Sequence, residues 1–198
     1  MFNEQSKAND TVACGVIQGG QADANAGAKG YYLVECRDAN GNLKWEEAMP
    51  NTVVNVGLQD MNTKYFSGSS YTAAWYIGLY GAAATNSPNA TDTMSSHGAE
   101  GAGGWTEVTA YSQSTRPQCV FGTATTADPS VISNSASPAS YSITGSVTVG
   151  GAFLVSNSTK GGSTGTLFSA ADFASPGDRS VVSGDSLSVT YTFSLDAA

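Results

Sequence analysis

Charged residues are scarce in this chain of 198 residues, where they make up 12% of the sequence. That is about half the share found in an average soluble protein. The eight Lys and Arg are outnumbered by 16 Asp and Glu, which gives a net charge of −8. Because a nucleic-acid-binding surface needs a basic stripe, and no basic run occurs, we expect no nucleic-acid partner.

Long apolar runs are also missing. No stretch approaches the roughly 20 apolar residues that a membrane-spanning helix requires. The N-terminal sequence MFNEQSKANDTVACG lacks the basic segment and following apolar segment of a secretion signal. We therefore expect no membrane partner, and we expect the chain to be made and folded in a cytoplasm.

The residues of the common catalytic sites are few. The single histidine, His97, lies among small residues and is expected to be solvated. Gly161–Gly165 fits G-x-S-x-G, but a nucleophile elbow needs a following helix and a later histidine. Asp172, Asp178 and Asp185 lie near turns without the spacing of a calcium loop. No phosphate-binding or dinucleotide motif occurs. We expect no enzyme, no catalytic residue, no cofactor and no metal.

The three cysteines, Cys14, Cys36 and Cys119, are too widely spaced for a zinc site. One interpretation is three reduced thiols, with Cys36 and Cys119 partly buried in strands. The alternative is that one or more of them form disulfides between chains after release into an oxidising medium. An odd count leaves at least one thiol without a partner inside the chain, and Cys14 sits in a predicted N-terminal arm.

What the chain has in abundance is small and β-branched residues, which favour an all-β fold with many turns. Residues 1–29 are polar and rich in Gly, Ala and Asn, and we predict an extended arm there. Strands are predicted over Tyr31–Cys36 and Leu43–Met49. They are joined by a hairpin turn at Asn40-Gly41, a dipeptide typical of such turns.

One helix is predicted after Pro50, capped by Asn51 or Thr52. Its apolar stripe comprises Val54, Leu58, Met61 and Tyr65, which is the spacing of a helix lying on a sheet. Asp60 and Lys64 are four residues apart in the favourable order for an ion pair. Gly57 weakens this helix without a reason visible in the sequence.

Further strands are predicted over Tyr71–Tyr80, with Trp75 at its centre, and over Gln118–Thr126. Between them lies a long loop, Gly81–Gly104, which is a candidate contact with a neighbouring subunit. Trp105–Tyr111 is ambiguous between a helical turn and a strand.

The C-terminal third has the clearest period of two. Ser140–Ser169 predicts three short strands with a Gly/Ser/Thr loop at Ser156–Gly165. Leu187 to Leu195 alternates apolar and polar residues, which indicates a half-buried strand. The expected fold is mainly β: an antiparallel β-sandwich, jelly-roll- or Ig-like, with one short helix, the arm at 1–29 and a single domain over 30–198.

Several separated motifs occur in one order over residues 30–195. The chain contains DANGNLKW, then NTVVNVGL, then YTAAWYIGL, followed by GGWTEVTAYSQSTRP, SPASYSIT, GGAFLVSNSTKGGSTGTLFSAADF and VVSGDSLSVTYTFSL. In this combination the chain resembles a group of tailed-bacteriophage virion structural proteins that are often labelled as head-decoration or tail-fibre proteins.

The resemblance implies a non-enzymatic virion protein. The first hypothesis is a capsid decoration (cement) protein on the outer head shell, with the major capsid protein as partner and self-association as a homotrimer. The alternative is a tail or head fibre component involved in host attachment, in which Trp75 and Trp105 stack on sugars. Either implies synthesis in the host cytoplasm and a place in the virion.

Overall fold

The computed structural model describes residues 27–68, 70–71, 74–81, 88–97, 106–173 and 177–196. The predicted arm therefore lies almost wholly outside the described residues, as do Cys14 and Trp105. No helix among the described residues is long and apolar enough to cross a membrane.

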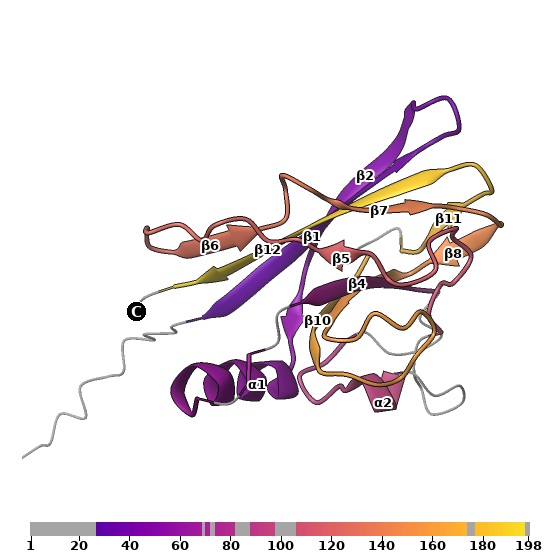
Figure 1. Ribbon diagram of the computed structural model, residues 1–198. Helices are drawn as coiled ribbons and strands as arrows, with labels where there is room; N and C mark the ends of the chain where they lie inside the picture. Colours follow the sequence, from indigo (N-terminus) through magenta and orange to yellow (C-terminus); the bar gives the residue numbers. More distant parts are fainter. Residues whose placement is uncertain are drawn as a thin grey trace, which may run out of the picture.

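The fold is mainly β, with antiparallel strands throughout and two short helices (Figure 1). The first half contains β1 (Ala28–Arg37), β2 (Leu43–Pro50), β3 (Thr52–Val53), α1 (Asn55–Phe66), β4 (Trp75–Tyr80), α2 (Met94–His97) and β5 (Gln118–Cys119). The second half contains β6 (Ser130–Ser133), β7 (Ala139–Ser142), β8 (Val147–Val149), β9 (Gly151–Val155), β10 (Leu167–Asp172), β11 (Arg179–Val181) and β12 (Ser186–Leu195).

Two five-stranded sheets form the sandwich. The first has the order β2-β1-β12-β6, with β7 also paired to β12, and the second has the order β3-β10-β9-β4-β5. Strands β8 and β11 form a separate small ladder. In Figure 1 the long β1, β2 and β12 lie over the shorter strands of the second sheet. The predicted antiparallel β-sandwich is confirmed.

The core lies between these sheets, as the alternating patterns predict. Along β12, Leu187, Val189, Tyr191 and Phe193 are buried while the residues between them are not. Tyr141 bridges the layers, because its hydroxyl donates a hydrogen bond of 2.7 Å to the carbonyl of Ile77. Such pairing satisfies a buried hydroxyl that would otherwise cost stability.

The β1–β2 hairpin forms where Asn40-Gly41 predicts it. Gly41 has φ of 85°, a conformation that glycine adopts without strain. The Asp38 carboxylate accepts hydrogen bonds from the backbone N–H of Asn40 and Asn42 and from the Asn42 side chain. These hydrogen bonds hold the pKa of Asp38 below its ordinary value, and the bond from the Asn42 side chain has the largest effect.

The start of the predicted helix is wrong. Asn51 and Thr52 do not cap it: Thr52 lies in β3, paired with Ala170 of β10, and Asn51 donates a hydrogen bond to the Tyr191 hydroxyl. The helix begins at Asn55, with Val54 as its N-cap. Sheet pairing across the core therefore overrides the local capping preference.

Gly57 has a tertiary reason. A Cβ atom at this position would lie 2.6 Å from the carbonyl oxygen of Phe168 in β10. The first turn of α1 thus approaches the backbone of the sheet more closely than a side chain allows, and this contact fixes where the helix lies.

Three other predictions need correction. The strand expected over Tyr71–Tyr80 begins at Trp75. The strand expected over Gln118–Thr126 ends at Cys119, because Gly122 and Thr125 bond irregularly to Ser133 and Val131 instead of continuing the ladder. The long loop Gly81–Gly104 contains a second short helix, α2.

Candidate functional site

The apolar stripe of α1 becomes more exposed from the start of the helix to its end. Val54 is fully buried, Leu58 and Met61 are half-buried, and Tyr65 is 81% exposed. The prediction of a helix lying on a sheet therefore holds only for the first turns. Beyond Met61 the helix and the sandwich diverge, and the space between them is a groove.

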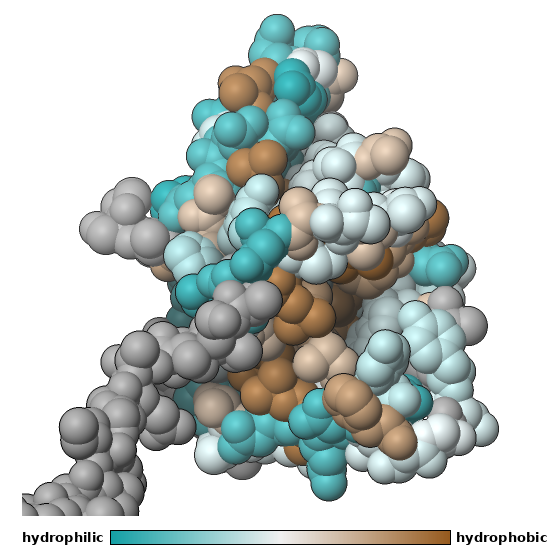
Figure 2. Space-filling model, turned by 90° about the vertical axis from the view of Figure 1, so that its left-hand side faces the viewer, coloured by the Kyte–Doolittle hydropathy of each residue, from teal (hydrophilic) through white to brown (hydrophobic). Residues whose placement is uncertain are grey.

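This groove has a volume of about 360 Å³, within the range of ligand pockets, about 300–1,000 Å³. We call it the α1 groove. Its helix side is formed by Asp60, Met61, Lys64 and Tyr65, its mouth by Tyr71 and Trp75, and its floor by Phe121, Ile132, Leu154, Phe168, Tyr191 and Phe193. Figure 2 faces this end of the molecule and shows hydrophobic residues gathered in a hollow between hydrophilic ones.

The aromatic rings of the floor pack against one another and against Trp75. The Phe168 ring packs edge-on against Phe193 at 5.3 Å and against Trp75 at 5.5 Å. Phe121 packs similarly against Tyr191. Such contacts add to the stabilisation from burial itself, so the floor is preformed.

Three of the polar residues that line the groove, Asp60, Lys64 and Tyr191, already have partners. Lys64 and Asp60 form the predicted ion pair, at 2.9 Å. The Tyr191 hydroxyl accepts hydrogen bonds from Asn51 and Ser169. The groove therefore offers mainly aromatic and aliphatic surface to whatever binds it.

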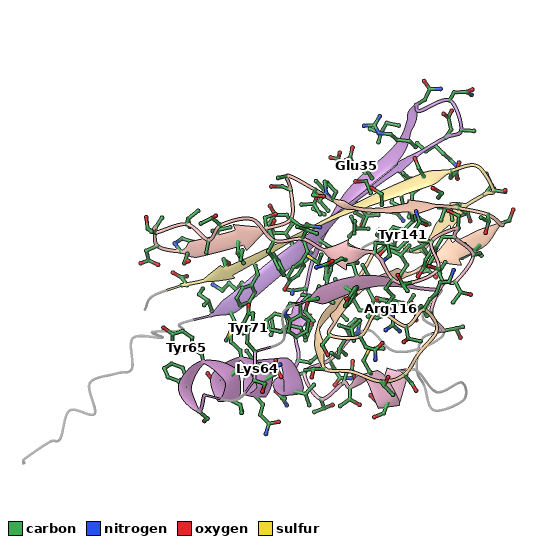
Figure 3. All side chains as sticks on the ribbon, viewed as in Figure 1. Glu35, Lys64, Tyr65, Tyr71, Arg116 and Tyr141 are labelled. Atoms are coloured by element: carbon green, nitrogen blue, oxygen red, sulfur yellow. The ribbon has the colours of Figure 1, made fainter. Side chains whose placement is uncertain are left out.

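A second cluster surrounds Arg116, whose side chain is fully buried. Its guanidinium donates two hydrogen bonds to the Glu107 carboxylate, at 2.9 and 2.7 Å. It also donates to the carbonyls of Asn157 and Gly162 and lies over the Phe153 ring. We call these residues the Arg116 cluster; it lies away from α1 (Figure 3).

This cluster explains the elbow-like sequence. Gly161–Gly165 lies in the connection between β9 and β10, two strands, and not between a strand and a helix. The Gly161 N–H donates to Glu107, and Lys160 donates to the carbonyls of Tyr111 and Gln113. Hydrogen bonds to the charged groups of Glu107 and Lys160 thus hold this loop in place. His97 ends α2, with its side chain outside the described residues.

Two of the carboxylates that lie near turns, Asp172 and Asp185, accept structural hydrogen bonds. Asp172 accepts a hydrogen bond from the Tyr80 hydroxyl. Asp185 accepts from Lys44 at 2.6 Å and from the backbone of Val182. The hydrogen bond to Asp185 raises the pKa of Lys44. No group of three His, Cys, Asp or Glu placed to hold a metal occurs among the described residues.

Cys36 and Cys119 are free thiols buried in strands. Burial raises the pKa of Cys36 to about 11 and that of Cys119 to about 12. A disulfide forms through the thiolate and needs access, so this placement argues against Cys36 and Cys119 as links between chains. A link through Cys14 stays a prediction.

The α1 groove is the site that sequence reasoning missed. The period of its helix stripe is the same whether the stripe is buried or partly uncovered. The one sequence signal that could have revealed it is the cluster of aromatic residues Tyr65, Phe66 and Tyr71. No protein-family model, curated protein or solved structure matches the chain.

Proposed function

We propose that the chain is a non-enzymatic structural protein of a bacteriophage virion, and specifically a capsid decoration protein. In this role it binds the major capsid protein on the outside of the head shell and stabilises that shell as a homotrimer. The ordered series of motifs that resembles tailed-phage virion proteins supports this assignment. Several of these motifs build scaffold: DANGNLKW forms the β1–β2 hairpin, and YTAAWYIGL ends in β4.

The observation that carries the proposal is an exposed aromatic pair at the end of α1. The rings of Tyr65 and Phe66 pack edge to face at 4.8 Å, and the residues are 81% and 77% exposed. Aromatic residues are enriched where proteins bind one another. On a domain with a net charge of −8, this pair supports the end of α1 as the attachment point to the shell.

Multivalency fits the same role. A small exposed contact is weak alone, but three linked copies that contact neighbouring capsid subunits gain avidity by raising the effective concentration of each contact. The net charge of −8 favours solubility at high copy number before assembly.

Capsid rebinding tests the proposal. Virions stripped of this protein should rebind the purified chain at hundreds of copies per particle, and rebinding should fall at least tenfold with Phe66→Ser. Leu43→Ser, at a residue 51% exposed on the β1–β2 hairpin, is the matched control and should rebind normally. A stoichiometry of a few copies located at the tail would overturn the decoration role.

A fibre component that attaches to host glycans is the second candidate. Exposed Tyr71 and half-buried Trp75 at the mouth of the α1 groove are the kind of side chains on which sugars stack. The paired state of Asp60 and Lys64 counts against it, because sugar recognition also needs free hydrogen-bonding groups. Loss of infectivity with Tyr71→Ser, without loss of capsid strength, would favour this candidate.

A further inference from the structure

The α1 groove leaves apolar surface in contact with water. Its floor joins residues of both sheets, and its helix wall carries Met61 and Tyr65. Covering apolar surface is favourable. A ligand that supplies aliphatic side chains would gain this energy, whereas a polar ligand would find Asp60, Lys64 and Tyr191 already paired.

The start of β1 lies beside this groove. Gly30 of β1 pairs directly with Phe193 of β12, and Phe193 forms part of the groove floor. Ala28, where β1 begins, pairs with Leu195, which is 44% exposed. The first residues of β1 therefore lie next to the groove.

The preceding chain contains one apolar run, Val12–Ile17, which reads VACGVI. Gln18–Gly27 follows it with the sequence QGGQADANAG, a composition typical of a linker. Fully extended, such a linker reaches about 35 Å, and its average span is about 18 Å. The apolar run can thus reach a groove that begins within a few residues of Ala28.

We propose that the Val12–Ile17 segment of the chain docks in the α1 groove of the same molecule. Its aliphatic side chains then cover the aromatic floor between α1 and the first sheet. A short linker gives the segment an effective concentration in the millimolar range. At micromolar protein this favours the molecule's own segment over that of a second copy by roughly a thousandfold. The proposal does not depend on the virion role.

Cysteine cross-linking tests this docking in the full chain. Cys14 lies in the middle of the segment, and Tyr71→Cys places a second thiol at the groove mouth. Tyr31→Cys is the matched control. Tyr31 is 44% exposed on the outer side of β1, close to Ala28 and away from the groove. Cys36 and Cys119 do not compete, because both are buried.

With oxidised glutathione, the Tyr71→Cys chain should form an intramolecular Cys14 disulfide at least tenfold faster than the Tyr31→Cys chain. Without docking, the same linker carries Cys14 to either position, and residue 31 lies only three residues from the start of β1, so reach alone gives no preference for residue 71. Adding Val16→Asp and Ile17→Asp should remove the difference while the melting temperature of the sandwich stays nearly unchanged. Equal rates, an unaffected rate in the Asp variant, or disulfide-linked dimers in place of monomers would each overturn the proposal.

Discussion

The Arg116 cluster and the α1 groove are both built where connecting segments meet the second sheet, but they differ in what they leave unsatisfied. At the Arg116 cluster, a buried guanidinium has a bidentate carboxylate partner and two carbonyl acceptors. At the α1 groove, the aromatic floor is ordered but open. The segments at the Arg116 cluster are thus held by contacts within the chain, whereas the segments at the α1 groove leave apolar surface available for binding.

The difference follows from the energetics of the two kinds of group. A buried charge without partners costs several kcal/mol, so a fold that contains Arg116 must supply every partner internally. Exposed aromatic surface costs far less per side chain and is tolerated. Function at a surface is therefore expected at the α1 groove.

Removing the guanidinium should have the largest effect. Arg116→Met leaves the Glu107 carboxylate, 10% exposed, without its ion pair, and should lower the free energy of unfolding by about 3–5 kcal/mol. Urea unfolding followed by circular dichroism measures this. The double variant Arg116→Met, Glu107→Met should recover part of the loss, because no lone charge stays buried. A loss below about 1 kcal/mol in the single variant would contradict this account of the cluster.

Raising the pH to 10 should weaken the sandwich next most strongly. Burial raises the thiol pKa of Cys36 to about 11 and of Cys119 to about 12 from an ordinary 9.0. Above pH 9 the unfolded chain releases these protons while the folded chain keeps them. Their contribution to stability is therefore complete below pH 9 and is lost as pH rises toward 11 to 12, at about 1.4 kcal/mol per pH unit per thiol.

Tyrosines steepen this loss above pH 10, since burial also raises the pKa of Tyr191 at the groove and of Tyr111 near the Arg116 cluster. Urea unfolding between pH 7 and 11 measures the profile. Cys119→Ala serves as the control and should flatten the slope between pH 9 and 10. A stability that stays constant up to pH 11 would show that these groups are not buried.

Adding a side-chain atom at the close contact between α1 and β10 should lower the free energy of unfolding by an intermediate amount. Gly57→Ala adds a Cβ atom 2.6 Å from the Phe168 carbonyl oxygen. The resulting displacement should cost about 1–3 kcal/mol, despite the gain of roughly 1 kcal/mol in helix propensity. Asn62→Ala, at an exposed position of the same helix, is the control and should be neutral or slightly stabilising. A stabilised Gly57→Ala variant would mean that the helix does not rest on the sheet backbone.

Trimming the exposed aromatic pair should have the smallest effect on folding. Phe66→Ser should change the free energy of unfolding by no more than about 0.5 kcal/mol, because Phe66 is 77% exposed. Thermal unfolding measures this and at the same time qualifies the variant for capsid rebinding. A loss above 2 kcal/mol would place Phe66 in the core and remove the argument for an attachment surface.

Local sequence patterns predicted the strands in which apolar and polar residues alternate. β1, β2 and β12 lie where alternation and the Asn40-Gly41 turn place them, since a strand with one buried face needs apolar residues at every second position. The short strands β3, β6 and β11 were missed. They contain two to four residues, too few for a period to appear. β3 and β6 are held by pairing with the longer β10 and β12, and β11 pairs with β8, which is equally short.

The sequence by itself determined the class of fold, the core face of β12 and the Asp60–Lys64 pair, because each depends on spacing along one element. The tertiary structure decided the start of α1, the need for Gly57 and the partners of Arg116, because each depends on atoms from segments far apart in the chain. The α1 groove belongs to this second group. A helical stripe reads the same in sequence whether a sheet covers all of it or only its first turns, and only the divergence of α1 from the sandwich uncovers the aromatic floor.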